Sequence, residues 1–181
     1  GGMVLSNEHS IDKKAREYHD HGHENNPSLP RGRDTRTNYG FNYRMTEMQG
    51  AVGKVQLSKL DYIINENYKR YNSLEKMFPS NLNKRNIPVG SEPIYDTFIF
   101  FTDFKDKKEN YIKILNEEGF GTKNLPDAME WHCTYFWDHA LNQEQITHSK
   151  ITKELLEKAI AIPISLNKSI ENYSNLGKKL F

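Results

Sequence analysis

The amino-acid sequence predicts an α/β to α+β fold, in which one long helix connects a loop-rich N-terminal part to a small α+β domain. Three observations support this prediction. Apolar residues recur with helical spacing between residues 46 and 79. Two segments at residues 93–104 and 160–165 are rich in aromatic and β-branched side chains, which is typical of strands. Helical patterns separate and follow these segments, so we expect a small sheet packed against helices.

The N-terminal part contains little regular structure. Met3–Leu5 is predicted as a short strand, and Ile11–His19 as a helix that Asn7 or Ser10 caps by accepting hydrogen bonds from its free N–H groups. The segment from His19 to Gly40 is rich in Gly, Pro and Asn and has no period. We therefore predict a long loop, of the kind that often carries function.

The helix at residues 46–79 has a clear beginning and end. Thr46 and Gln49 have the spacing of a capping box, in which each side chain binds the backbone of the other residue. Pro79 stops the apolar stripe. At 1.5 Å per residue this helix would be about 50 Å long, so it is predicted to connect two domains.

The remaining residues, 80–181, are predicted as the small domain. Gly119 and Gly121 are expected to end a helix and form a turn. The predicted elements, in chain order, are a strand within Pro93–Phe104 and helices at Lys107–Glu118 and Thr152–Ala159, followed by a strand at residues 160–165 and a helix at Ser169–Leu180.

Composition excludes several classes of partner. The net charge of +1 gives no basic footprint for nucleic acid. No apolar run approaches the roughly 18 residues that a membrane-spanning helix needs. Cys133 is the only cysteine, so an internal disulfide is impossible, which suits the reducing cytoplasm. We expect a cytoplasmic protein that binds neither nucleic acid nor membrane.

The His19-Asp20-His21-Gly22-His23 run raises the possibility of a metal site, because imidazoles two residues apart share a face of an extended chain. No cysteine or convincing set of carboxylates completes such a site, and Gly22 makes the run flexible. We therefore predict no metal and expect a solvated or substrate-facing loop.

Three arginines, Arg31, Arg33 and Arg36, follow in the same loop. Guanidinium groups bind phosphate or carboxylate through two hydrogen bonds, so these residues are candidates for anion binding. The alternative is a solvated basic loop in which the arginines pair with Asp34 and Glu24. The residues themselves do not decide between the two.

Asn42-Tyr43-Arg44 lies just before the predicted helix N-terminus, where free N–H groups and the helix dipole favour anions. The alternative is that Tyr43 packs and Arg44 pairs with Glu47.

A second cluster is aromatic. Its side chains either form core, because aromatic residues dominate buried area, or line a pocket in which His132 hydrogen-bonds a sugar or a carboxylate. The cluster comprises Trp131, His132, Tyr135, Phe136, Trp137 and His139.

The stretch "GFNYRMTEMQGAVGKVQLSKLD" resembles a signature of the DegT/StrS-type sugar aminotransferases, which are pyridoxal-phosphate (PLP) enzymes of the aspartate-aminotransferase fold, fold type I. "GGMVLSN", "AREYHDHG" and "IAIPISL" are similar to further family segments in the same order. The resemblance covers nearly the whole chain and implies the carboxy-terminal half of such an enzyme. Residues 1–45 would end the large cofactor domain, residues 46–79 would form the connecting helix, and residues 80–181 would form a small domain with a short antiparallel sheet.

The resemblance also implies roles for individual residues. The Schiff-base lysine is expected upstream of Gly1, so no catalytic residue is assigned here, and the chain alone should bind no PLP and be inactive. The glycines before Met3 are either a cloning remnant or follow a missing segment. Asn42 matches the asparagine that hydrogen-bonds the PLP phosphate of the neighbouring subunit in a homodimer. Expected substrate-binding residues are Arg31, Arg33, Arg36, Tyr43, Arg44 and His132.

The activity implied by the resemblance is transfer of an amino group, usually from glutamate, to a keto sugar for lipopolysaccharide or another surface glycan. The acceptor would be a nucleotide-linked keto sugar or a keto sugar acid. "MEWHCTYFWDH" resembles members that act on eight-carbon keto sugar acids. The competing hypothesis is a truncated, non-catalytic relative that only binds a sugar or a partner.

Overall fold

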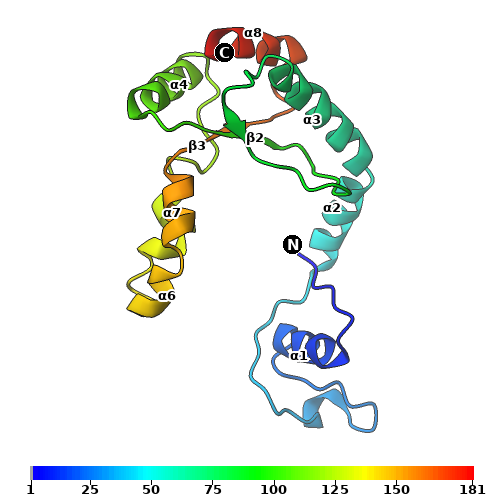
Figure 1. The fold of residues 1–181 in the computed structure, drawn as a ribbon. Coiled ribbons are helices and arrows are strands. Elements are labelled where there is room, and N and C mark those ends of the chain that lie inside the picture. Colours follow the sequence, from blue (N-terminus) through cyan, green and yellow to red (C-terminus); the bar gives the residue numbers. More distant parts are fainter. Residues whose placement is uncertain (1) are drawn as a thin grey trace. The chain divides into compact units, whose positions relative to one another are not determined.

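A computed structural model describes residues 2–181 (Figure 1). The chain divides into two compact units, the first ending at Lys59 and the second spanning Leu60–Phe181. The first unit contains the helices α1 (His9–His19), η1 (Arg31–Arg33, one turn of 3₁₀ helix) and α2 (Glu47–Leu57). The three predicted domains remain a prediction for a longer protein.

The beginning of the first unit differs from the sequence prediction. Met3–Leu5 is not a strand and is largely exposed, because no neighbouring strand within residues 2–181 pairs with its backbone. Helix α1 begins at His9, earlier than predicted. Its N-cap residue is Glu8, and neither Asn7 nor Ser10 caps it.

The capping box that begins α2 is confirmed. Thr46 accepts from the Gln49 amide, and the Gln49 side chain accepts from the Thr46 amide. The prediction of one continuous helix over residues 46–79 is wrong, because a turn at Ser58–Lys59 separates α2 from α3 (Leu60–Glu75). The Ser58 hydroxyl donates to the Val55 carbonyl at 2.8 Å. Such bonds from serine to its own helix compete with helical hydrogen bonding.

The second unit is built on a three-stranded antiparallel sheet in the order β1-β2-β3, which confirms the predicted fold class. The strands are β1 (Asn83–Lys84), which the sequence analysis missed, β2 (Thr97–Phe101) and β3 (Ala159–Pro163). Phe98 pairs with Ile162 and Phe100 with Ile160. These four side chains share one face of the sheet and are fully buried.

Helices α3 and α8 (Ile170–Leu180) pack against each other and cover this apolar face. Figure 1 shows them side by side above the sheet. Tyr71 and Leu74 of α3 and Tyr173 and Leu176 of α8 enter the same core. The other helices are α4 (Lys105–Glu117), α5 (Met129–His132), η2 (Thr134–Phe136), α6 (Gln143–Thr147) and α7 (Lys150–Leu156).

The remaining boundaries differ in detail. The strand predicted within Pro93–Phe104 is shorter, because Tyr95 has a φ of 52°, which breaks extended backbone. The helix predicted at Thr152–Ala159 ends at Leu156, because Ala159 pairs with Phe101 in the sheet. The turn at Gly119 and Gly121 is confirmed, with φ values of 68° and 63°.

Candidate functional site

The Asn42-Tyr43-Arg44 segment is held against the end of α1 by backbone hydrogen bonds. Phe41 donates to the Tyr18 carbonyl at 2.8 Å, and Tyr43 donates to the His19 carbonyl at 2.9 Å. These bonds enclose an isolated antiparallel bridge between Asp20 and Asn42. The conformation of the segment is therefore defined by α1, although the sequence places the two about 20 residues apart.

Two glycines allow this close approach. A Cβ atom on Gly40 would lie 2.6 Å from the Tyr18 carbonyl oxygen and 2.5 Å from the Gly22 nitrogen. Gly22 has a φ of 79°, and a Cβ there would lie 2.1 Å from the Asn38 carbonyl oxygen. A side chain on Gly40 would push the loop away from α1, and one on Gly22 would displace the loop backbone at Asn38. Gly22 thus has a defined packing role.

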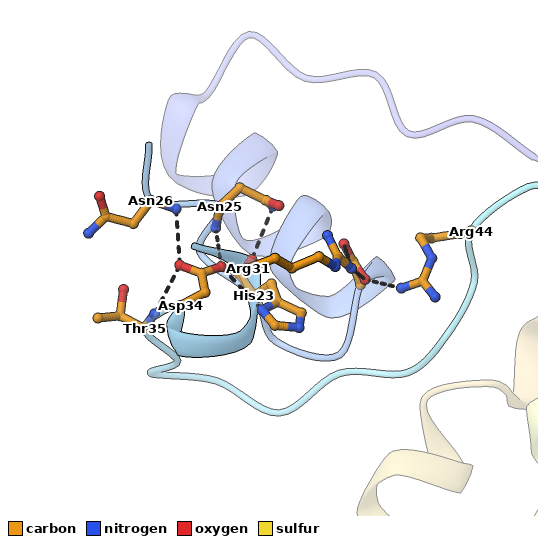
Figure 2. Close-up of polar contacts among 8 residues, drawn as sticks. His23, Asn25, Asn26, Arg31, Asp34, Thr35 and Arg44 are labelled. Atoms are coloured by element: carbon orange, nitrogen blue, oxygen red, sulfur yellow. Dashed lines mark hydrogen bonds and ion pairs between the residues drawn. The ribbon is translucent and has the colours of Figure 1, made fainter. Parts of the chain in front are cut away.

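Asp20 is buried and binds two arginines (Figure 2). Nη2 of Arg31 lies 2.7 Å from both carboxylate oxygens, and Nη1 of Arg44 donates to Oδ1. In Figure 2 the side chains of Arg31 and Arg44 reach the same carboxylate, which belongs to Asp20, the one drawn residue without a label. We refer to these three residues as the Asp20 cluster. The alternative in which Arg44 pairs with Glu47 is not observed, because the Arg44 guanidinium binds the Asp20 carboxylate.

The Asp20 cluster has a defined electrostatic consequence. Hydrogen bonds from Arg31, and then from Arg44, lower the pKa of Asp20 to about 2 against the opposing effect of burial. The carboxylate is therefore ionised at neutral pH. Because two guanidinium groups share one carboxylate, the cluster keeps a net positive charge.

A second carboxylate organises the arginine loop. Asp34 accepts from the backbone amides of Asn25, Asn26 and Thr35 at 2.8, 3.0 and 2.9 Å, and its Oδ2 lies 3.1 Å from Nδ1 of His23 (Figure 2). Bonds from the Asn26 amide and the other backbone groups lower the pKa of Asp34. The Asp34 carboxylate is thus hydrogen-bonded to groups of its own loop. Pairing of the arginines with Asp34 and Glu24, the alternative left open by the sequence, is not formed among the described residues.

The other candidate residues of this unit are exposed. Arg33 and Arg36 make no ion pair within residues 2–181. The Tyr43 ring is 62% exposed and lies beside Tyr18 and Phe41, with centroids 6.1 and 5.8 Å away. Asn42 is exposed, and its Oδ1 lies 3.4 Å from the Arg44 amide nitrogen. The packing alternative for Tyr43 is therefore only partly correct.

His132 lies in the second unit, at the end of α5, and is exposed. The aromatic segment around it is not core. Trp131 is 78% exposed. The segment lines a cavity of about 370 Å³ that does not include His132; the lining residues are Glu130, Trp131, Phe136, Trp137, His139 and Ala140.

Sequence reasoning missed Asp20, because its partners Arg31 and Arg44 are 11 and 24 residues away. The available signal was a lone aspartate in "YHDHGH", directly after a predicted helix. Within residues 2–181, no three His, Cys, Asp or Glu side chains are grouped as a metal ion would require. In the same range, no helix is both long and apolar enough to cross a membrane.

Solved structures similar to this chain define its fold as the C-terminal part of a PLP aminotransferase. Helicobacter pylori PseC, an aminotransferase involved in the biosynthesis of pseudoaminic acid, has a TM-score of 0.66 at 14% identity, over 97% of this chain and 46% of PseC. 3-Amino-5-hydroxybenzoic acid synthase has a TM-score of 0.69 at 16% identity, over 97% of this chain and 47% of the synthase. The sugar aminotransferase CalS13 of Micromonospora echinospora has a TM-score of 0.68 at 12% identity, over 96% of this chain and 45% of CalS13. The chain thus spans less than half the length of these proteins.

The model of the DegT/DnrJ/EryC1/StrS aminotransferase family matches residues 1–180. The chain belongs to this family, whose members are PLP-dependent aminotransferases. This confirms the resemblance based on the Asn42-Tyr43-Arg44 signature.

The described residues fit one part of PLP, its phosphate group. Asn42 has an exposed amide whose Nδ2 makes no hydrogen bond to another described residue, and amide N–H groups donate to phosphate oxygens. The net positive charge of the adjacent Asp20 cluster favours an anion.

Proposed function

We propose that this chain is the C-terminal portion of a PLP-dependent aminotransferase that transfers an amino group from glutamate to a keto sugar for surface-glycan synthesis. The single observation that carries the proposal is the family match over residues 1–180. PLP, when bound, carries the amino group between donor and acceptor. The proposed roles of this chain's own residues are to bind and orient the cofactor and the substrate.

Asn42 is proposed to donate from Nδ2 to the PLP phosphate of the other subunit in a homodimer. Its exposure supports this role, as does the contact of its Oδ1 with the Arg44 amide, because Nδ2 makes no hydrogen bond to another described residue and stays available as a donor. An exposed donor that its own unit does not use is suited to a ligand held by another subunit.

The substrate's anionic group is proposed to meet the arginine loop. Arg33 and Arg36 are exposed and free of ion pairs within the described residues, so their guanidinium groups are available for a carboxylate or a phosphate. Arg31 and Arg44 would add positive charge from fixed positions, and Tyr43 would offer an exposed ring. We also propose His132, exposed on the second unit, as a hydrogen-bonding partner of the sugar.

The test compares the complete reading frame that encodes this chain with the 181-residue chain alone. Each protein is incubated with PLP, glutamate and a panel of nucleotide-linked keto sugars and keto sugar acids, and amino-sugar formation is followed by mass spectrometry. We expect turnover by the complete protein only, since no lysine of residues 1–181 is proposed to bind the cofactor covalently. Turnover and stoichiometric, borohydride-trapped PLP with the chain alone would contradict the proposal. A complete reading frame without such a lysine and without turnover would favour the non-catalytic alternative.

A further inference from the structure

We infer that Asp20 is the positioning residue for Asn42, acting through Arg44. This inference rests on the proposed function of Asn42 and assigns Asp20 a role that is distinct from substrate binding.

The backbone alone leaves the Asn42 side chain free. The bonds from Phe41 to Tyr18 and from Tyr43 to His19 fix the residues on either side, and His21 donates to the Phe41 carbonyl at 3.0 Å. None of these bonds involves the Asn42 side chain. A further constraint is needed to hold its amide in one orientation.

Arg44 supplies that constraint. Its backbone N–H meets Oδ1 of Asn42 at 3.4 Å, while its guanidinium group reaches the Asp20 carboxylate. The two contacts come from opposite ends of one residue, so fixing the guanidinium also restricts the backbone that faces Asn42. With Oδ1 in contact with the Arg44 amide, the exposed Nδ2 stays available as a donor.

Asp20 can fix Arg44 because its own carboxylate is buried and bound by Arg31. Its side chain is only 9% exposed, and Arg31 binds both of its oxygens. Removing the charge from a buried, paired carboxylate leaves its partners uncompensated. By contrast, among the described residues Asp12 of α1 pairs only with Arg16, four residues away, and its side chain is 44% exposed. Asp12→Asn is therefore the matched control for Asp20→Asn.

The first measurement uses the complete protein without added PLP, so it does not depend on the cofactor. Amide hydrogen exchange is followed by NMR in the parent chain, Asp20→Asn and Asp12→Asn. We expect Asp20→Asn to accelerate exchange of the Arg44 amide, which meets Oδ1 of Asn42, by about tenfold or more and to leave the β2 amides unchanged. Asp12→Asn should change the exchange of neither the Arg44 amide nor the β2 amides. Unchanged exchange at the Arg44 amide in Asp20→Asn would overturn the inference, whatever the fate of the proposed function.

The second measurement distinguishes positioning from general support of the fold. PLP dissociation constants are determined for the complete protein with Asp20→Asn, Asn42→Ala and both changes. If Asp20 acts through Asn42, Asp20→Asn weakens binding by about threefold to tenfold in the parent and has no further effect in Asn42→Ala. An equal effect on both backgrounds, or no effect on the parent, overturns the inference. If the parent itself does not bind PLP, the proposed function fails, and the exchange data still decide whether Asp20 orders the segment.

Discussion

At the scale of single residues, burial decides what a carboxylate does in this chain. Asp12 and Asp20 both lie at helix α1 and both bind arginine. Asp12 forms an exposed pair within one helix, which contributes little to stability. Asp20 is buried and connects α1, η1 and the segment ahead of α2, so its charge defines the geometry of a loop.

The titration of Asp20 follows from these contacts. Its pKa is lowered from 3.8 to about 2 in the folded chain, so its ion pairs stabilise the fold above pH 3.8. That contribution is lost as the pH falls from 3.8 through about 2. We expect the Asp20 carboxyl carbon, followed by NMR and assigned with Asp20→Asn, to titrate near pH 2. A midpoint close to pH 3.8 would show that Arg31 and Arg44 do not lower the pKa of Asp20.

Asn42 provides the second prediction at this scale. A hydrogen bond to a charged group contributes about 1.5–3 kcal/mol, so Asn42→Ala should weaken PLP binding by the complete protein about tenfold to a hundredfold. Asn42→Asp should be worse, because it places a carboxylate near the phosphate. Binding is measured by absorbance titration, with the exposed Asn65→Ala as control. Parent-like affinity in both Asn42 variants would remove Asn42 from the cofactor site.

At the scale of elements, the loop and α1 fit together only because two glycines bring them into contact. Gly40→Ala should separate the loop from α1 and destabilise the first unit by about 1–3 kcal/mol, the range for overpacked sites. The expected readout is faster exchange of the Phe41 amide. Gly32→Ala is the matched control, because its Cβ would meet nothing within 4 Å. Equal exchange in the two variants would contradict the packing described here.

Local signals in the sequence predicted the elements that local chemistry defines. The Thr46–Gln49 capping box and the helix beginning after Ser169 are examples, since the residues that form each cap are three apart. The turn at Ser58–Lys59 could not be predicted, because Leu57 and Leu60 continue the apolar stripe across it. Met3–Leu5 has strand composition without a partner strand among the described residues. Asp20 was missed because only the folded loop brings its arginines to it.

At the scale of the whole molecule, the two units differ in how they are held together. The second unit has a continuous apolar core around Phe98, Phe100 and Tyr173. In the first unit the buried side chains are polar, namely Glu17, Asp20 and His23. Its apolar side chains are exposed instead, including Met48, Val52 and Val55 on α2.

This exposed face predicts self-association. Large exposed apolar patches drive association, so we expect the average mass of the chain in sedimentation equilibrium to rise with concentration. Val52→Lys should reduce the effect. Ile151→Lys is the control and should not reduce it. Ile151 is also exposed and apolar, but it lies on α7 of the second unit and not on the exposed face of α2. A chain that stays monomeric at high concentration would refute this expectation.

The proposed function requires that Asn42 of one chain reaches the PLP phosphate in the active site of another subunit. The most direct test mixes two impaired versions of the complete protein, one with Asn42→Ala and one lacking the cofactor-binding lysine, at a PLP concentration that saturates the parent protein but not Asn42→Ala. In a heterodimer one site carries both changes and the other carries neither, so we predict partial recovery of amino-group transfer. Heterodimers that form, as verified by native mass spectrometry, yet recover no activity would show that Asn42 acts within its own subunit and would contradict the claim.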